Sequence, residues 1–389
     1  MKLLVLLSRI PYPLDKGDKL RAYYQLKQLS RDFEIKVVAL DDSNSSERDQ
    51  EKLRNEFDIQ FVKLSKTVIY LKMFRALFSD KPFQVHYFFQ RSANLKVKEI
   101  VSEFKPDHIY CQLIRTAEYV KNIHSIPKTM DYMDAFSKGM DRRISQNRGI
   151  KKFLIKAEAS RLLKYENLIF DYFENKTIIS SQDQSLIYHP ERNSIKVVPN
   201  GVDFDFFNPD QSPNQTFDLV FTGNMSYPPN VDGALFLVNE IMPIVWKKMP
   251  QAKVLIAGAK PTTAITSLKC SNVVVSGWVD DIRESYSSSS VFIAPMRIGT
   301  GLQNKLLEAM SMGVPCITTA FANNALKAVN GESILIGNSK ESLAELVINL
   351  LNDSVLRKNL SIAGRAFIEA NYSWRTSTAL LIDSIKHEP

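Results

Sequence analysis

Short runs of aliphatic and β-branched residues alternate along this chain with longer stretches in which apolar residues recur every three or four positions. In the first half the short runs occupy residues 3–7, 35–40, 108–111, 177–180 and 196–198, and a helical stretch covers residues 19–30. After residue 215 the alternation begins again, with short runs at 219–222, 253–257, 273–276, 291–294 and 316–318 and a helical stretch at 231–248. Continuous apolar runs are typical of strands covered on both faces, and their alternation with helices predicts βαβ units. The pattern therefore predicts an α/β protein with two doubly wound, parallel-sheet domains.

A stretch rich in proline, asparagine, aspartate and glycine separates the two series. It runs from Pro199-Asn200-Gly201-Val202-Asp203 through Phe207-Asn208-Pro209 to the polar residues 210–215. This composition is typical of turns and linkers, so we place the first domain at residues 1–198 and begin the second at residue 199. Open α/β sheets bind nucleotides outside the carboxyl ends of their strands. Two such domains facing each other would hold a ligand in the cleft between them.

Length and charge agree with two domains of different character. The 389 residues suit two domains that each bury a core. Residues 1–200 carry 35 basic and 25 acidic side chains, a net charge of +10, whereas residues 201–389 carry 15 and 17, a net charge of −2. A charge asymmetry of this kind indicates an anionic partner on one side only.

Several classes of protein are excluded by composition. The three cysteines form no CxxC pair and the five histidines form no HxH or HExxH pattern, so neither a disulfide framework nor a zinc site is expected. The first apolar run is too short for a secretory signal and is followed at once by Arg9, Pro11 and Pro13. No stretch approaches the length of about 18 apolar residues that crosses a membrane. We therefore expect a cytoplasmic protein whose first apolar run is a buried strand.

The densest chemical signal lies between Pro295 and Pro315, where a predicted strand is followed by a loop with two glycines and then by a helix. Free backbone N–H groups at a helix N-terminus bind anions, and glycines allow a phosphate to approach closely. Lys305 lies in the first turn, where a positive charge is unfavourable to the helix dipole unless an anion binds there. Glu308 lies further along the helix, where a carboxylate could accept hydrogen bonds from two ribose hydroxyls. The alternative is an ordinary strand-to-helix turn with a solvated lysine and glutamate.

Six motifs follow one another in order along almost the whole chain. The first combines Arg9-Ile10-Pro11-Tyr12-Pro13 with Gly17 and Arg21, and the second is the linker at 198–203 with 207–209. The others lie at residues 221–225, 276–281, 306–310 with 313–315, and 372–374. Together they resemble the motifs of the GT-B glycosyltransferases, in particular family 4, the retaining group 1 enzymes that use nucleotide-sugar donors. The loop and helix at 299–308 look like those of a subgroup associated with exopolysaccharide biosynthesis.

The resemblance implies the GT-B fold, with two facing Rossmann-like domains and a C-terminal helix, here residues 371–389, that crosses back to the first domain. The donor domain would then span residues 199–370, and residues 1–198 would form the acceptor side. Donor-binding roles are implied for the residues at matching positions, which are Gly17, Gly223, Asn224, Trp278, Val279, Asp281, Thr300, Gly301, Gln303, Asn304, Lys305 and Glu308. Of these, Glu308 would hold the ribose, residues 301–305 the diphosphate, and Trp278 with its neighbours the base.

The chain departs from the family pattern near the donor sugar and the diphosphate. The family's Glu-x7-Glu motif ends at the position of Glu308, but eight residues earlier this chain has Thr300. The arginine and lysine that usually bind the diphosphate correspond to positions near Asn224 or Met225 and Asn230, none of which is cationic. These departures bear on the donor sugar more than on the fold, and they leave a catalytically inactive homologue as an alternative.

Candidate residues of the first domain follow its predicted strands. Gly17 and Arg21, after the first strand, could contact the donor phosphates, the alternative being a turn glycine and a surface arginine. Asp131 and Asp134 follow a further short strand and could orient sugar or acceptor hydroxyls, although N-capping of the next helix would also explain them. The catalytic candidates are thus Asp134, Asp131 and Arg21, and the acceptor-side candidates are Gln112 and Arg115.

Asp203-Phe204-Asp205 is formally a DxD motif, which binds a metal and a diphosphate in the other large glycosyltransferase fold. Here it lies in the linker and lacks the strand end that the motif requires, so we interpret it as a turn and predict no metal. Helix N-termini and lysine or arginine side chains would instead stabilise the charge on the departing diphosphate.

Basic and aromatic residues are interleaved in residues 60–100, and basic residues are again concentrated in residues 138–164. Such a surface suits an anionic membrane or a polyprenyl-diphosphate acceptor. For residues 66–78 the alternative is aromatic core packing beneath a solvated basic face. No helix-turn-helix, RRM or zinc pattern accompanies the charge, so no nucleic acid partner is expected.

The sequence as a whole predicts a retaining, metal-independent glycosyltransferase of the hexosyltransferase type. It would move a sugar from a nucleotide-sugar donor, a UDP-sugar, to a saccharide or lipid-linked acceptor in cell-surface polysaccharide biosynthesis, with no further cofactor. We expect it in the cytoplasm, peripherally at the inner face of the cell membrane. The alternatives are a non-catalytic sugar-nucleotide or glycan-binding homologue and a nucleotide-sugar epimerase, which would need several cleft carboxylates and histidines that this chain lacks.

Overall fold

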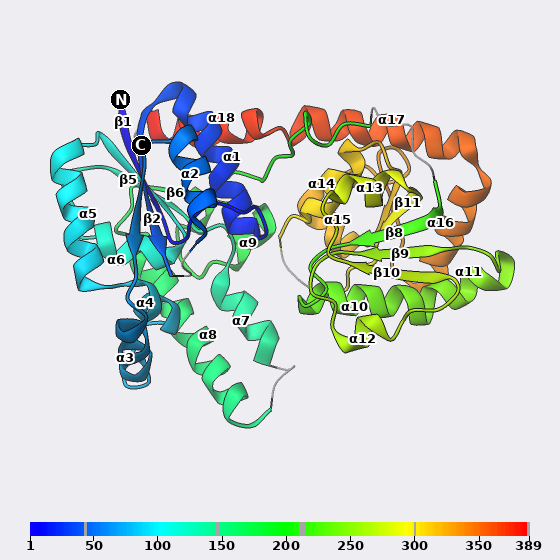
Figure 1. Cartoon of the computed structure of the whole chain (residues 1–389), viewed down its shortest axis with the longest axis horizontal. Coiled ribbons are helices and arrows are strands. Elements are labelled where there is room, and N and C mark those ends of the chain that lie inside the picture. The colour runs from blue at the N-terminus through cyan, green and yellow to red at the C-terminus, as the bar shows by residue number, and fades with distance from the viewer. Residues whose placement is uncertain (43–44, 145–147, 210–214, 299–300, 387–389) are drawn as a thin grey trace. The chain divides into compact units, whose positions relative to one another are not determined.

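The chain forms two compact units, each built on its own parallel sheet (Figure 1). The computed structural model describes residues 1–42, 45–144, 148–209, 215–298 and 301–386. One unit comprises Met1–Pro199 together with the segment that begins at Ser377, and the other comprises Asn200–Thr376. The units are described separately below.

The first unit contains a seven-stranded parallel sheet with the order β3-β2-β1-β4-β5-β6-β7. Its strands are β1 (Lys2–Leu7), β2 (Glu34–Asp41), β3 (Ile59–Lys63), β4 (His108–Gln112), β5 (Lys128–Asp131), β6 (Asn175–Ile178) and β7 (Lys196–Val197). The chain builds outward from β1 to β3 and then continues from β4 on the other side of β1. The carboxyl ends of β1 and β4 are therefore neighbours at the point where the order reverses, which is where open α/β sheets bind ligands.

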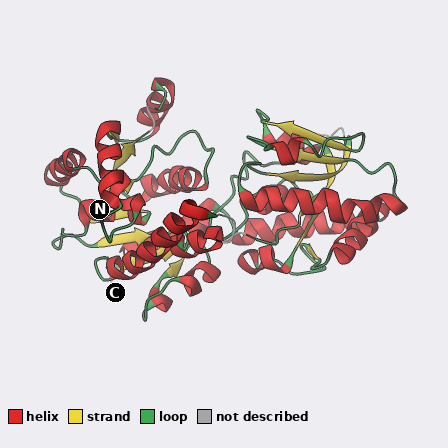
Figure 2. Cartoon of the chain, turned by 90° about the horizontal axis from the view of Figure 1, so that it is seen from below, coloured by secondary structure: helices red, strands yellow, loops and turns green. Residues whose placement is uncertain are grey.

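Helices cover both faces of this sheet, as Figure 2 shows in red against the yellow strands. They are α1 (Gly17–Asp32), α2 (Glu47–Glu56), α3 (Lys66–Ala76), α4 (Phe83–Phe88), α5 (Arg91–Phe104), η1 (Ile114–Thr116), α6 (Ala117–Val120), α7 (Phe136–Ile144), α8 (Gly149–Phe170), α9 (Ser181–Leu186), η2 (Arg192–Ser194) and α18 (Trp374–Lys386). Because side chains alternate along a strand, Leu4 packs in one core layer and Leu3 in the other. The layer of Leu3 also contains Leu381 and Ile385, so α18 closes this face of the first unit.

The second unit repeats the same arrangement with six parallel strands in the order β10-β9-β8-β11-β12-β13. The strands are β8 (Phe217–Thr222), β9 (Val254–Ala257), β10 (Val273–Gly277), β11 (Ser289–Ala294), β12 (Cys316–Thr318) and β13 (Leu335–Ile336). Its helices are α10 (Pro228–Phe236), the π-helical turn η3 (Leu237–Ile241), α11 (Met242–Lys248), α12 (Thr263–Thr266), α13 (Ile282–Ser287), α14 (Asn304–Ser311), α15 (Ala320–Leu326), α16 (Lys340–Asn352) and α17 (Ser354–Asn371). The order again reverses next to β8, between β8 and β11.

The linker is held within the second unit by backbone contacts. Val202 pairs with Ser373, and its N–H donates to the carbonyl of Tyr372 at 2.8 Å. A side chain at Gly201 would lie 2.6 Å from the Cα of Trp374, so this close approach requires glycine.

The two doubly wound sheets predicted from the apolar runs are confirmed, and the differences have physical causes. The predicted helix at 231–248 begins earlier, at Pro228, and contains the π-helical turn. The strand β3 was not predicted because it lies at the sheet edge, where polar Gln60 and Lys63 interrupt its apolar residues. The strand β13 has only two residues, too few to produce a pattern.

Candidate functional site

In the second unit, the turn after β8 brings polar groups close to the start of α14. Gly223 has a φ of 149°, and a side chain there would lie 2.6 Å from Nδ2 of Asn230 and 3.2 Å from Nζ of Lys305. The side-chain amide of Asn230 donates to the carbonyl of Asn224 at 3.0 Å. A glycine is therefore needed for these polar groups to meet the turn.

Lys305 is held in this turn by an amide and an aromatic ring. Its ammonium donates to Oδ1 of Asn230 and lies 4.6 Å from the centre of the Phe221 ring. Burial lowers the pKa of Lys305 to about 7, and the nearby Glu308 carboxylate only partly opposes this. An anion bound at this ammonium would favour its charged form and raise the pKa.

Glu308 lies one turn further along α14 and is also buried. One of its carboxylate oxygens accepts from the Tyr286 hydroxyl at 2.7 Å, and that hydroxyl lies 2.9 Å from the Thr222 hydroxyl. Burial raises the pKa of Glu308, while the Tyr286 hydrogen bond and Lys305 lower it. Tyr286 was not predicted from the sequence, because a tyrosine in a short helix carries no signal that it orients a carboxylate.

The first residue of α14 is hydrogen-bonded to the linker. Oδ1 of Asn304 accepts from Nδ2 of Asn200 at 3.1 Å, and Nε2 of Gln303 donates to the carbonyl of Gly301 at 3.3 Å. Gly301 has a φ of 74°, a conformation that favours glycine. Thr300 lies outside the described residues.

The residues of the predicted base-binding segment differ in their exposure and in their hydrogen bonds. Trp278 is exposed with its indole N–H donating to Asp280 at 3.2 Å, and Val279 is half-buried beside it. Asp281 instead caps α13 by accepting from the N–H of Arg283 at 3.0 Å, and both its oxygens accept from the Arg283 guanidinium. This capping role accounts for Asp281 without a nucleotide.

In the first unit, Arg21 and Asp131 form a fully buried ion pair. Nε of Arg21 donates to Asp131 at 2.7 Å and Nη2 donates to its other oxygen at 3.2 Å, while Nη1 donates to the carbonyl of Val198 at 2.9 Å. The hydroxyls of Tyr110 and Thr177 also donate to Asp131, at 2.9 and 3.0 Å. Both charged side chains are 0% exposed. The surface position considered for Arg21 is wrong, and this pair joins α1 to β4, β5 and β6 rather than presenting free groups to a ligand.

A second polar cluster lies at the carboxyl ends of β1, β4 and β5. The Arg115 guanidinium lies between the rings of Phe88 and Phe136, at 5.2 and 5.1 Å from their centres, and its Nε donates to Gln84 at 2.8 Å. Its buried Nη1 lies 3.9 Å from an oxygen of Asp18 and has no hydrogen-bond partner among the described residues. Burial lowers the pKa of Arg115 to about 10.

Asp18 connects this cluster to the start of α1. Its carboxylate accepts from Arg9 at 2.8 Å, and its carbonyl accepts from Nε2 of Gln112 at 3.1 Å. Gly17, immediately before it, is exposed, and a side chain there would meet no atom of the described residues within 4 Å. The structure thus brings Gln112 and Arg115 together around Asp18.

Asp134 belongs to the same cluster and carries an orphaned oxygen. Its buried Oδ1 has no hydrogen-bond partner among the described residues. Burial, reinforced by the carboxylates of Asp183 and Glu166, raises the pKa of Asp134 to about 8, against the opposing effect of Arg115. The first turn of α7 is capped by Glu166, whose oxygen accepts from the N–H of Ser137 at 3.0 Å. With a pKa of about 8, the carboxyl of Asp134 is mostly protonated near neutral pH.

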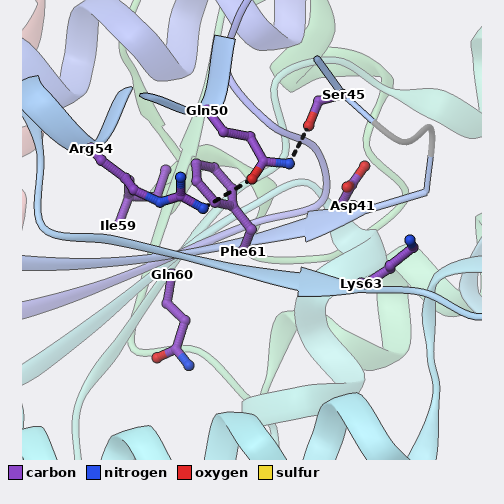
Figure 3. A pocket seen from close by; sticks show the side chains of 8 residues that line it. All are labelled: Asp41, Ser45, Gln50, Arg54, Ile59, Gln60, Phe61 and Lys63. Atoms are coloured by element: carbon purple, nitrogen blue, oxygen red, sulfur yellow. Dashed lines mark hydrogen bonds between the residues drawn. The ribbon is translucent and has the colours of Figure 1, made fainter. Parts of the chain in front are cut away.

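Two further features, a cavity beside β3 and the DxD segment, lie apart from these polar clusters. A cavity of about 400 Å³ lies beside the edge strand β3, lined among others by Gln50, Arg54 and Lys63 (Figure 3). None of the predicted site residues that the structure describes borders it. The DxD segment is a turn in which Oδ1 of Asp203 accepts from the N–H groups of Asp205 and Phe206 at 3.1 and 3.2 Å.

Comparison with known proteins relates the chain to one enzyme family. Residues 216–353 match the family model described as "Glycosyl transferases group 1". An "Uncharacterized 44.6 kDa protein in cps region" of Klebsiella pneumoniae is 25% identical over 95% of this chain and 96% of its own length. A GDP-mannose-dependent mannosyltransferase acting on a phosphatidylinositol monomannoside, from Corynebacterium glutamicum, is 27% identical over 49% of this chain and 56% of its own. The capsular polysaccharide biosynthesis glycosyltransferase CapM of Staphylococcus aureus is 33% identical over 26% and 27% of the two chains.

Solved structures share the fold at low sequence identity. Sucrose-phosphate synthase from Thermosynechococcus elongatus has a TM-score of 0.68 and 14% identity over 98% of both chains. HepE from Anabaena in complex with UDP has a TM-score of 0.67 and 13% identity over 99% of this chain and 100% of its own. At this identity the similarity establishes the two-domain fold.

Proposed function

Since this chain belongs to the group 1 glycosyltransferases and has the GT-B fold, we propose that it is a retaining enzyme of family 4. It would transfer a sugar from a UDP-sugar to a saccharide or lipid-linked acceptor in cell-surface polysaccharide biosynthesis. The observation that carries the proposal is the pair Lys305 and Glu308 on α14, held beside the glycine turn after β8 by Asn230 and Tyr286. The relatives in a cps region and in capsule biosynthesis support the polysaccharide assignment.

On the donor side, each group has a distinct task. Lys305 would donate to the diphosphate and remain charged as the bond to the sugar breaks, which stabilises the leaving group without a metal ion. Its low pKa in the free protein is the expected consequence of burying a cation before its anion arrives. Glu308 would accept hydrogen bonds from the ribose hydroxyls, with Tyr286 fixing the orientation of the carboxylate. Trp278, which is exposed, would cover the base.

We propose that the acceptor binds at the polar cluster of the first unit, which contains Asp18, Gln112, Arg115 and Asp134. The orphaned oxygen of Asp134 and the orphaned Nη1 of Arg115 are groups that a hydroxyl-bearing ligand could satisfy. In a retaining reaction on one face of the sugar, the leaving phosphate helps to remove the proton of the attacking hydroxyl. Asp134 would then orient that hydroxyl rather than act as the base.

The nucleotide is the first property to test. Titration calorimetry should compare UDP-glucose with GDP-mannose, because a structural neighbour binds the former and a relative uses the latter. Glu308→Ala should abolish measurable binding or weaken it at least tenfold, whereas Glu345→Ala, at an exposed position of α16, should bind as the wild type does. If neither nucleotide-sugar binds to the wild-type protein, the proposed donor site is wrong.

Turnover and stereochemistry need separate measurements. Release of UDP in the presence of acceptor, with the anomeric configuration of the product read by NMR, tests transfer and retention together. A second candidate function, a non-catalytic sugar-nucleotide-binding protein, is favoured by Thr300 at the position of the family's first glutamate. Binding of a nucleotide-sugar without release of free nucleotide under any acceptor condition would support that second function.

We also propose that the acceptor side works at an anionic membrane surface, where a lipid-linked acceptor would be found. The structure contains, among its described residues, no helix long and apolar enough to cross a membrane. We propose that this association is peripheral.

A further inference from the structure

The helix α3 of the first unit has apolar residues on two sides. Ile69, Met73 and Ala76 face the core. On a neighbouring side of the helix, Tyr70 and Phe74 are 74% and 65% exposed, and Phe78, just after the helix, is 82% exposed. The rings of Phe74 and Phe78 pack against each other with centroids 5.9 Å apart. This aromatic stripe therefore contributes nothing to the core, and the interpretation of residues 66–78 as core packing is wrong for these side chains.

The first turns of α8 carry a similar surface. Ile150 and Phe153 are 80% and 72% exposed, and they lie three residues apart, on one side of the helix. Within the first unit α8 is fixed to the end of α3, because Arg161 donates to the carbonyl of Ala76 at 2.7 Å. Figure 1 shows α3 and α8 extending from the same end of the sheet. We call Tyr70, Phe74, Phe78, Ile150 and Phe153 the apolar docking surface.

Basic residues flank both parts of the docking surface. The segment 66–81 contains Lys66, Lys72, Arg75 and Lys81 with a single acidic residue, and the segment 148–157 contains four basic residues and no acidic one. Exposed aromatic and aliphatic side chains within a positively charged rim match a bilayer interface that bears anionic headgroups. A second copy of the same surface would bring like charges together, which disfavours self-association.

We propose that the docking surface inserts into the headgroup region of an anionic phospholipid bilayer, with the flanking lysines and arginines contacting the lipid phosphates. This inference rests on the proposed function, since it names the residues by which the acceptor side would reach its membrane. The apolar residues would supply insertion and the basic residues would supply the preference for anionic lipid.

Vesicle flotation of the full chain tests the proposal. Vesicles of phosphatidylcholine with phosphatidylglycerol should bind the protein, and binding should weaken in high salt and on vesicles of phosphatidylcholine alone. Phe74→Ser with Phe78→Ser, and separately Ile150→Ser with Phe153→Ser, should each lower the partition coefficient at least about tenfold. Lys151→Glu with Lys152→Glu should lower binding only to the anionic vesicles.

The matched control is Val355→Ser with Ile362→Ser, which removes exposed aliphatic residues from α17 of the second unit and should leave vesicle binding unchanged. Circular dichroism should show unaltered unfolding for all variants, because the changed side chains are exposed. The proposal would be overturned if the Phe74/Phe78 variant and the Ile150/Phe153 variant both bound vesicles as strongly as the wild-type protein does. It would also be overturned if these variants had a lower oligomer mass than the wild type in analytical ultracentrifugation but floated with vesicles unchanged.

Binding of UDP-glucose and GDP-mannose by the same variants separates this inference from the proposed function. Vesicle binding with no nucleotide-sugar binding would contradict the donor site and leave the docking surface supported. Nucleotide-sugar binding without flotation of the wild-type protein would contradict the docking surface and leave the donor site supported.

Discussion

If Lys305 binds the diphosphate of the donor, as we propose, its protonation state makes donor binding depend on pH in a way that can be worked out from the structure. With the pKa of Lys305 at about 7 in the free protein, the protonated fraction falls from roughly nine-tenths at pH 6 to roughly one-tenth at pH 8. Under the proposed function the diphosphate would bind the charged form, so binding at pH 8 should be accompanied by uptake of close to one proton. The dissociation constant for UDP-glucose should therefore rise about tenfold between pH 6 and pH 8.

Calorimetry in two buffers of different ionisation enthalpy measures both the affinity and the proton uptake. UDP-glucose is a suitable ligand because its diphosphate is fully ionised throughout this range. Lys305→Met should weaken binding about 10- to 100-fold at pH 6, through loss of a charge-assisted hydrogen bond, and should remove the pH dependence. Lys247→Met, at an exposed position of α11, should preserve both.

Two results would refute this reasoning. A wild-type affinity that stays constant from pH 6 to pH 8, without proton uptake, would mean that Lys305 does not face the diphosphate. A Lys305→Met variant with the same pH dependence as the wild type would assign the titration to another group, of which Glu308 is the nearest.

Four further predictions test the other clusters. Asp131→Asn should destabilise the first unit by about 3–5 kcal/mol, because it leaves the Arg21 charge buried without its partner; the loss should appear as a lower midpoint in urea unfolding of the full chain. Asp134→Asn should be more favourable at high pH: relative to the wild type, its free energy of unfolding should be about 1–3 kcal/mol higher at pH 9 than at pH 6. The sign follows because the folded carboxyl, with its pKa raised to about 8, retains a proton that the unfolded one has lost, so stability falls as pH rises from 4 to 8; thermal unfolding at both pH values checks it. Tyr286→Phe should weaken nucleotide-sugar binding about 2- to 10-fold in calorimetry, because Glu308 loses one donor. Gly223→Ala should abolish that binding, because the added methyl group would displace Asn230 and Lys305; a protein that folds and binds normally would contradict this steric argument.

Much of the local structure of the proposed donor site could be predicted from local sequence. A strand, a glycine loop and a helix are consecutive in the chain, so Lys305 and Glu308 are positioned by neighbouring residues and by helix geometry. Their partners could not be predicted in the same way. Tyr286 and Asn230 reach them from other elements, and only the folded sheet brings these elements together.

The catalytic candidates of the first unit differ in whether their buried polar atoms have hydrogen-bond partners. Arg21, Asp131 and Asp134 were all predicted as catalytic candidates, because each is a charged residue in a segment that follows a predicted strand. In the structure, Arg21 and Asp131 satisfy each other across α1 and β5, whereas Asp134 keeps an oxygen without a partner among the described residues. A sequence gives the spacing of charges along the chain, but not which charge neutralises which across a sheet.

The sequence alone therefore determined the architecture of each half, because the period of apolar residues is a local property that distinguishes covered strands from amphipathic helices. It also determined the charge asymmetry between residues 1–200 and 201–389. Only the tertiary structure decided which polar residues are buried, paired or orphaned, and that the aromatic residues of α3 are exposed. These properties depend on neighbours that are distant in sequence, and the apolar pattern of residues 66–78 is equally compatible with packing in a core and with docking on a lipid surface.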